Sequence, residues 1–266
     1  MGKETHLMAI LNITEDSFSD GGLYIDLPSA INRASFCINH GAHILDIGAQ
    51  STRPGASDVG AEIEIKRLVP LIKELKLLHP EIPISVDTFH HSVADKVLNI
   101  GADLVNDVSG GRHDPEIFNV MADKGSPYVL THSRGNSITM DSLAKYENVV
   151  NDVKKELSNQ IELALSNGLK TKQIIIDPGI GFAKNVDHNL TLLQNLEEFV
   201  SMNFPLLIGA SRKRFIGSVI NESDPSKRIF GMAAIASRCV LAGVDILRVH
   251  DIKEISQVIK MTKSII

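Results

Sequence analysis

The residue in this chain that most clearly suggests chemistry is a carboxylate at the end of an apolar run. Asp177 follows three isoleucines and precedes a glycine-rich turn in the stretch QIIIDPGIGFAK, residues 173–184. The isoleucine run is typical of a strand buried on both faces, as in parallel sheets. Pro178 and Gly179 end such a strand, and Gly181 allows close approach of the backbone to a ligand. By itself, a carboxylate here could equally be a helix N-cap or an ion-pair partner.

The same arrangement, an apolar strand followed by a polar end, recurs along the whole chain. The polar residues at these predicted strand ends are Asn12, Asp46, Asp87, Asn106, Asp177, Lys213, Arg248 and His250. In a parallel barrel the carboxyl ends of all strands face one rim, which is where active sites lie in that architecture. The sequence therefore predicts that these side chains surround a single pocket.

The acidic and amide members of this set point to a flat ligand rich in N–H donors. Asp87, Asn106 and Asp177 have no basic residue beside them in the sequence. Buried carboxylates need compensation, and a planar array of donors supplies it through paired hydrogen bonds. A pterin ring has such an edge.

The cationic members suit an anionic group nearer the surface. Arg248, His250, Lys213 and Arg53, together with the hydroxyl groups of Ser51 and Thr52, form a set that is typical of phosphate recognition. We therefore expect one ligand with a flat amide-like end and a phosphate end.

Strands and helices alternate in a way that can bring these residues together. The predicted strands cover residues 7–11, 43–47, 82–87, 103–108, 127–132, 173–177, 205–210 and 245–250. The predicted helices cover residues 28–40, 61–78, 91–100, 115–124, 146–167, 189–202, 215–221 and 226–241, and a last helix lies at the C-terminus. Eight such units in 266 residues favour a single-domain (β/α)8 barrel over an open, doubly wound sheet. No GxGxxG motif follows the first strand, which weakens a dinucleotide-binding interpretation.

Composition excludes several classes of protein. A net charge of -5 argues against nucleic-acid binding, and no run of about 20 apolar residues predicts a membrane span. The N-terminal MGKETHLMAIL is too short in its apolar part for a signal peptide. Cys37 and Cys239 lie in apolar helical settings, so we expect two buried thiols in a reducing compartment, and a cytoplasmic enzyme.

Seven motifs, in order along nearly the whole chain, resemble the dihydropteroate synthase family. They are NITEDSFSDGG (12–22), STRPG (51–55), SVDT (85–88), VND (105–107), DPGIGF (177–182), SRKRF (211–215) and RVH (248–250). Each is common alone, but seven in order are specific. The resemblance implies a barrel that joins 6-hydroxymethyl-7,8-dihydropterin diphosphate to p-aminobenzoate, with release of pyrophosphate, in folate synthesis. It also implies inhibition by sulfonamides, which mimic the second substrate, and a homodimer.

The resemblance also implies residue roles. The pterin-binding residues would be Asp87, Asn106, Asp177, Lys213 and Arg248, and the residues that contact the diphosphate would be Asn12, Thr52, Arg248 and His250. The p-aminobenzoate subsite would be formed by Phe18, Thr52, Pro54, Phe182 and Arg214. The catalytic residues would be Asp20, Arg53 and Lys213. Asn12 would also be the protein ligand of Mg²⁺, which binds mainly with substrate phosphates and water.

Four positions depart from the family pattern. Glu15, Gln50, Thr131 and Arg214 stand where the family more often has proline, glutamate, methionine and serine. None removes a central role, so we expect them to affect substrate affinity and sulfonamide response.

For the reaction itself we expect an SN1-like displacement, because the electron-rich pterin can stabilise positive charge on its methylene carbon.

Two alternative functions remain. One is a pterin-binding methyltransferase domain, which would not need STRPG or SRKRF, and the other is a non-catalytic pterin-binding paralogue. Retention of Asn12, Asp20, Arg53 and Lys213 together argues against the second.

Overall fold

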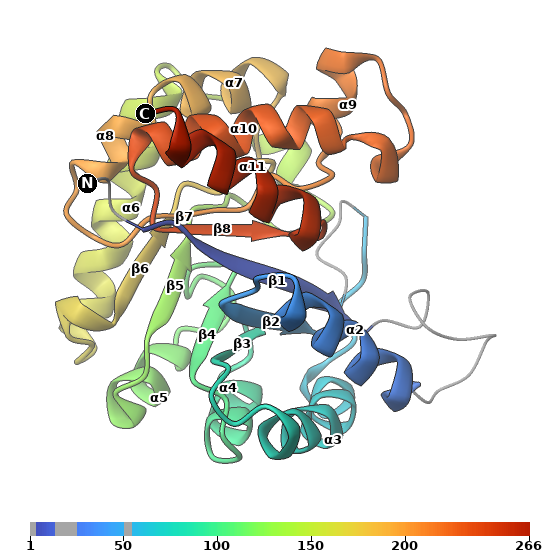
Figure 1. The fold of residues 1–266 in the computed structure, drawn as a ribbon. Coiled ribbons are helices and arrows are strands. Elements are labelled where there is room, and N and C mark those ends of the chain that lie inside the picture. The colour runs from blue at the N-terminus through green and yellow to red at the C-terminus, as the bar shows by residue number, and fades with distance from the viewer. Residues whose placement is uncertain (1–3, 14–25, 51–54) are drawn as a thin grey trace.

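Eight parallel strands form a sheet that curves into a nearly closed barrel (Figure 1). The computed structural model describes residues 4–13, 26–50 and 55–266. Within them the strands are β1 (His6–Asn12), β2 (Ile44–Gly48), β3 (Ile84–Asp87), β4 (Leu104–Asp107), β5 (Tyr128–Thr131), β6 (Ile174–Asp177), β7 (Leu207–Ile208) and β8 (Ile246–Val249). Their order is β6-β5-β4-β3-β2-β1-β8-β7, which confirms the predicted parallel arrangement.

The barrel closes between β6 and β7. A parallel bridge joins Ile176 to Leu206, and the Ile176 amide donates a hydrogen bond of 2.9 Å to the Pro205 carbonyl. Strand β7 has two residues, whereas the sequence predicted a strand over 205–210. It ends at Ile208, and at the next residue, Gly209, an added Cβ would lie 3.8 Å from the side chain of Arg248. The (β/α)8 barrel predicted from the alternating pattern is confirmed.

Helices cover the outside of the barrel (Figure 1). They are α2 (Leu27–Asn39), α3 (Ala61–Leu78), α4 (His91–Leu98), α5 (Ile117–Lys124), α6 (Val149–Ser166), α7 (Val186–Gln194), α8 (Leu196–Val200), α9 (Arg214–Ile220), α10 (Ile229–Ala242) and α11 (Ile252–Ser264). Short 3-10 turns, η1 (Met140–Leu143), η2 (Thr171–Gln173) and η3 (Pro225–Lys227), precede α6, β6 and α10.

One predicted helix is divided in two. The prediction of a single helix over 189–202 is wrong, because Asn195 leaves helical geometry at φ -117° and ψ 37° and separates α7 from α8. The apolar spacing continues across this break through the buried Leu192, Leu196 and Phe199. Spacing of apolar residues alone therefore could not show it. Helix α7 begins at Val186 because the Asn185 side chain accepts the His188 amide at 2.8 Å.

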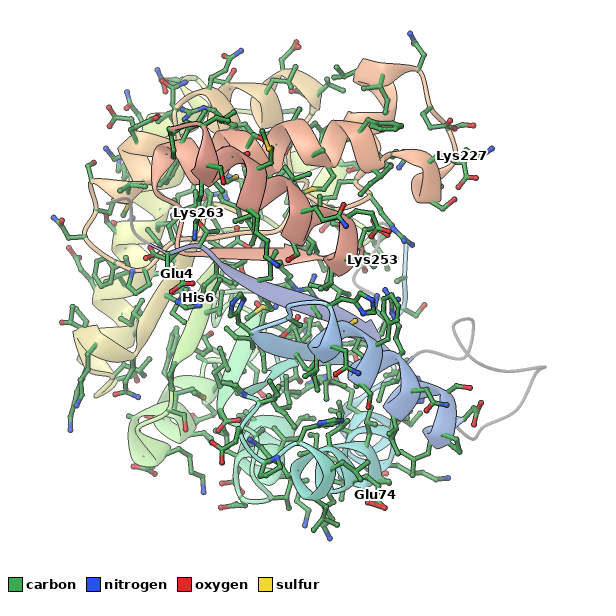
Figure 2. All side chains as sticks on the ribbon, in the orientation of Figure 1. Glu4, His6, Glu74, Lys227, Lys253 and Lys263 are labelled. Atoms are coloured by element: carbon green, nitrogen blue, oxygen red, sulfur yellow. The ribbon has the colours of Figure 1, made fainter. Side chains whose placement is uncertain are left out.

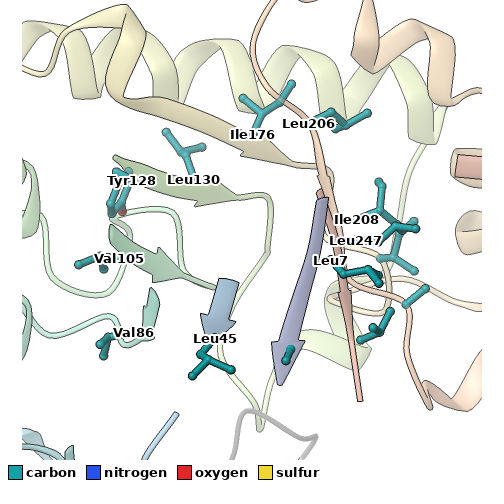
Figure 3. Close-up of a cluster of buried hydrophobic side chains, with 14 of the residues drawn as sticks. Leu7, Leu45, Val86, Val105, Tyr128, Leu130, Ile176, Leu206, Ile208 and Leu247 are labelled. Atoms are coloured by element: carbon teal, nitrogen blue, oxygen red, sulfur yellow. The ribbon is translucent and has the colours of Figure 1, made fainter. Parts of the chain in front are cut away.

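Two apolar layers result from the alternation of side chains along the strands. Outward-pointing residues such as Leu7, Val105 and Ile176 pack beneath the helices (Figure 3). Inward-pointing residues form a smaller buried cluster that fills the barrel interior: Met8, Leu104, Val129, Leu207 and Ile246. This plug makes the interior a packed core, so a ligand site must lie above it.

The remaining sequence-based expectations concern thiols and the surface. Cys37 and Cys239 are both buried and free, as predicted. Charged side chains are spread over the outside, with Glu74 on α3 and Lys227 in η3 at the periphery (Figure 2). None of the helices in the described ranges combines the length and apolar character that a membrane crossing requires.

Candidate active site

The inward-pointing residues that follow this plug along the strands lie at the barrel mouth. Asn106 follows Leu104 by two positions, Arg248 follows Ile246, and Asp177 follows Ile175, so each points to the same interior as its apolar predecessor. Asp87 pairs in register with Asn106 on one side and with Gly48 on the other. The predicted pterin-binding residues are therefore brought to one end of the barrel.

Arg248 links two buried carboxylates across this mouth. Its Nε donates to Asp46 Oδ2 at 2.5 Å, and its Nη2 donates to Asp87 Oδ2 at 2.6 Å. Asn106 Nδ2 donates to the same Asp46 oxygen at 3.1 Å. Asp87, which has no basic residue beside it in the sequence, thus takes a cationic partner from the last strand.

Burial changes the pKa values of the carboxylates at the barrel mouth. Burial raises the pKa of Asp87 to about 7, with the Arg248 guanidinium opposing and the Asp46 carboxylate adding to the rise. Burial also raises the pKa of Asp177, against the opposing Lys213 ammonium. Carboxylates held this way gain from a ligand that brings hydrogen-bond donors, because charged acids are costly away from water.

The loop after β6 depends on two glycines with positive φ. Asp177 Oδ1 accepts the Gly179 amide at 2.7 Å, and no described residue donates to its second oxygen. Gly179 has φ 70°, and a Cβ there would lie 1.8 Å from the His132 carbonyl oxygen. Gly181 has φ 83°, and a Cβ there would lie 2.6 Å from Lys213 Cδ. Only glycine lets Lys213 pass over this loop.

Lys213 is held between the loop and the carboxylates. Its Nζ donates to the Ile180 carbonyl and lies 4.3 Å from the centre of the Phe182 ring. Burial lowers the pKa of Lys213 to about 8, while the Asp177 carboxylate acts in the opposite direction. Two predicted site residues from different motifs, Phe182 and Lys213, are therefore in contact.

A second lysine, which the sequence analysis did not single out, supports the same loop. Lys184 is buried, and its Nζ lies 3.0 Å from the carbonyl oxygens of Gly179 and Phe182 and 3.0 Å from Nδ1 of His132. The other ring nitrogen of His132, Nε2, lies 3.1 Å from Glu156 Oε2 on α6. The only feature of the sequence that could have indicated this role is the position of the lysine directly after DPGIGFA.

The remaining predicted residues lie along the rim. Asn12 ends β1 and is half-buried. His250 Nδ1 lies 3.0 Å from the Ser211 hydroxyl, which joins the RVH and SRKRF motifs. Arg214 is exposed, and its Nη2 donates to both Asp141 oxygens at 2.9 and 3.0 Å. Arg214 thus pairs with the β5–α6 connection, and its side-chain hydrogen bonds involve no other predicted site residue of the described ranges.

Five predicted site residues lie outside the described residues: Phe18, Asp20, Thr52, Arg53 and Pro54. Glu15 is also outside them. Of the other departures from the family pattern, Gln50 and Thr131 are buried, and within the described residues neither Gln50 Nε2 nor Thr131 Oγ1 has a hydrogen-bond partner. Thr131 pairs in register with Asp177, and Gln50 follows the end of β2 by two positions.

Comparison with known proteins shows which family this chain resembles. The family described as pterin binding enzyme matches residues 8–250. A dihydropteroate synthase of Synechocystis is 46% identical over 264 residues, covering 99% of this chain and 91% of the relative. The dihydropteroate synthase structure from Clostridium difficile, solved in the presence of pteroic acid, has a TM-score of 0.92 and 38% identity, with 99% and 97% of the two chains covered. The Yersinia pestis enzyme with a sulfonamide complex has a TM-score of 0.92 and 34% identity, with 98% and 94% covered.

Proposed function

The chain belongs to the dihydropteroate synthase family of pterin-binding transferases, and on that premise we propose the reaction it performs. It joins 6-hydroxymethyl-7,8-dihydropterin diphosphate to p-aminobenzoate and releases pyrophosphate. The observation that carries this proposal is the ring of Asp87, Asn106, Asp177, Lys213 and Arg248 above the apolar plug of the barrel.

The pterin end of the substrate matches the deep part of this ring. A carboxylate that accepts two N–H donors forms a strong paired contact, and Asp177 has one oxygen without a donor among the described residues. The Asn106 amide and the Asp87 carboxylate extend the same polar wall. The planar guanidinium of Arg248 is held by two carboxylates, so one of its faces can stack on the flat ring.

The diphosphate end would lie toward Asn12, Thr52, Arg248 and His250. Asn12 suits a Mg²⁺ site: its side chain takes no hydrogen bond from the described residues, and a Cβ on neighbouring Gly48 would lie 3.4 Å from its Oδ1. The glycine therefore keeps space open beside the amide oxygen. One neutral oxygen fits an ion that keeps its waters and takes its other ligands from phosphates. When bound, Mg²⁺ would neutralise charge on the leaving diphosphate.

We propose an SN1-like displacement at the pterin methylene carbon. The carbon–oxygen bond breaks first, the electron pair leaves with pyrophosphate, and the amine of p-aminobenzoate then bonds to the carbon and loses a proton. The carboxylates of Asp87 and Asp177 favour this order because they stabilise positive charge spread over the ring. The amine needs positioning more than a strong base, and the resemblance assigns that task to Asp20, Arg53 and the Phe182–Lys213 contact.

Two further proposals concern partners. Sulfonamides would compete with p-aminobenzoate, because the subsite formed with Phe182 recognises an aromatic amine with an anionic group. A homodimer would cover part of the apolar surface of α9 to α11, where the Phe230 side chain is 85% exposed and Leu241 and Met261 are also exposed.

The test is release of pyrophosphate by the purified chain with both substrates and Mg²⁺, with the pteroate product identified by mass spectrometry. The expected result is equal formation of pyrophosphate and dihydropteroate. Pyrophosphate without dihydropteroate would indicate a hydrolase, and no turnover with normal pterin binding would indicate a non-catalytic paralogue.

A further inference from the structure

Three residues outside the barrel mouth bring metal-ligating atoms together. Asp58, His90 and His113 each offer one ligand atom, and all three atoms lie within 4.8 Å of one another. Asp58 lies between β2 and α3, His90 immediately precedes α4, and His113 lies between β4 and α5. The cluster therefore joins three loops that follow neighbouring strands on the carboxyl side of the sheet.

The two distances from the histidine nitrogens to the Asp58 carboxylate are close to the ligand separations around a tetrahedral metal ion. His90 Nε2 lies 3.2 Å from Asp58 Oδ1, and His113 Nε2 lies 3.8 Å from Asp58 Oδ2. Ligands bound to zinc at about 2.0–2.1 Å stand about 3.3 Å apart in tetrahedral geometry. Small movements of Asp58 and of the exposed His113 ring would bring all three atoms to those positions.

A fourth residue, Glu64 on α3, makes the cluster more than a surface hydrogen-bond network. Its side chain is fully buried, with its Oε1 3.6 Å from His90 Nε2. Among the described residues neither oxygen has a hydrogen-bond partner of normal geometry, although the Thr88 hydroxyl and the Arg67 cation are close enough to lower the pKa of Glu64. Burial dominates and raises the pKa of Glu64 to about 8. A buried carboxylate without a firm partner is costly, and a cation beside it would remove that cost.

The two imidazole rings are held by packing. The Phe89 ring centre lies 4.7 Å from that of His90 and 4.2 Å from that of His113, and the two imidazoles meet edge to face at 5.2 Å. If the only role of this cluster were a hydrogen bond between Asp58 and His90, neither the position of His113 nor the buried Glu64 would be required. Rings already fixed in orientation lose little freedom when they bind an ion.

From these contacts we propose that Asp58, His90 and His113 bind one divalent transition-metal ion, with zinc as the best match, water as the fourth ligand, and the buried Glu64 carboxylate beside the His90 ligand. Two imidazoles and a carboxylate favour zinc over magnesium or calcium, which prefer oxygen ligands alone. The ion ties the described part of the loop after β2 to the loops after β3 and β4. This site is separate from Asn12 and does not depend on the proposed reaction.

The decisive experiment is calorimetric titration of the chelator-treated chain with zinc alone. One zinc per chain is expected, together with a rise in melting temperature, because a ligand that binds only the folded state stabilises it. His113→Ala tests the site with little risk to folding, since His113 is an exposed loop residue. It should weaken zinc binding at least about tenfold, because loss of even an outer-shell partner typically costs about 10–100-fold. The control is His91→Ala, whose ring instead contacts Asp114 at 2.7 Å.

Glu64→Gln provides an independent test with two opposite effects. The neutral amide should stabilise the metal-free chain and weaken zinc binding. Cobalt substitution should give the intense visible absorption of a four-coordinate site, and His113→Ala should abolish it. The proposal is overturned if zinc does not bind stoichiometrically, if His113→Ala binds zinc like the unaltered chain, or if Glu64→Gln leaves zinc affinity unchanged.

Discussion

Nη2 of Arg248 lies 2.6 Å from Oδ2 of Asp87, although 161 positions separate the two residues in the chain. The contact spans the barrel mouth from β8 to β3, and the same guanidinium holds Asp46 on β2. One cation thus compensates two buried carboxylates. This arrangement stabilises the fold and also holds the polar wall that a pterin would contact.

Arg248→Met should destabilise the chain by about 3–5 kcal/mol, because it leaves buried carboxylates without their cation. Urea unfolding measures the loss. The control is Arg238→Met, which removes a pair with Glu197 at the surface and should cost at most about 1 kcal/mol. Equal losses in the two variants would contradict a structural role for the Arg248 pairs.

Asp177→Asn should weaken binding of a pterin analogue by about 1–3 kcal/mol while leaving stability nearly unchanged. The amide oxygen can still accept the Gly179 amide, but its nitrogen would face a donor of the ligand. Calorimetric titration measures the affinity, with Asp187→Asn on the exposed side of α7 as the control. Unchanged affinity in Asp177→Asn would place the pterin elsewhere.

Lys184→Met should raise the KM for p-aminobenzoate more than it lowers kcat. The variant removes the lysine donor from both carbonyls of the loop: Gly179 keeps only the Phe182 amide as a donor, and the Phe182 carbonyl loses its lysine donor at about 1–3 kcal/mol, so the DPGIGF loop is less firmly held. Steady-state kinetics with Lys172→Met as the exposed control measures this. A pure loss of kcat, with KM unchanged, would argue that Lys184 does not position the loop.

The contribution of His132 to the free energy of unfolding should fall as the pH drops from about 6.5 toward 3. Burial, with the Lys184 ammonium, lowers the pKa of His132 to about 3. In the unfolded chain the pKa of a histidine is about 6.5, so between these values the unfolded state binds more protons and acid favours it. The contribution to the slope reaches about 1.4 kcal/mol per pH unit.

His132→Gln isolates this effect, because an amide can accept from Lys184 and donate to Glu156 without titrating. Its unfolding free energy should depend less steeply on pH between 6.5 and 4. Urea unfolding at a series of pH values measures both curves. Parallel curves would show that His132 takes up its proton equally in the two states.

Local sequence was sufficient to predict where the strands end and which side chains stand there. A buried strand reads as a continuous apolar run, and the polar residue that follows it must face solvent or a ligand. Asp177, Asp87 and Asn106 were predicted on this basis, and the structure brings them to one mouth. The break at Asn195 was missed because the apolar spacing continues through it.

Only the closed barrel determined which of these polar residues pair. The Arg248 contacts with Asp46 and Asp87, the support of DPGIGF by Lys184 and His132, and the approach of Glu64 to His90 all join separate elements. Local propensity carries no information about such pairs, because they depend on strand register and on helix packing across the whole domain. The sequence by itself determined the residues available for chemistry, and barrel closure decided their partners and their charge.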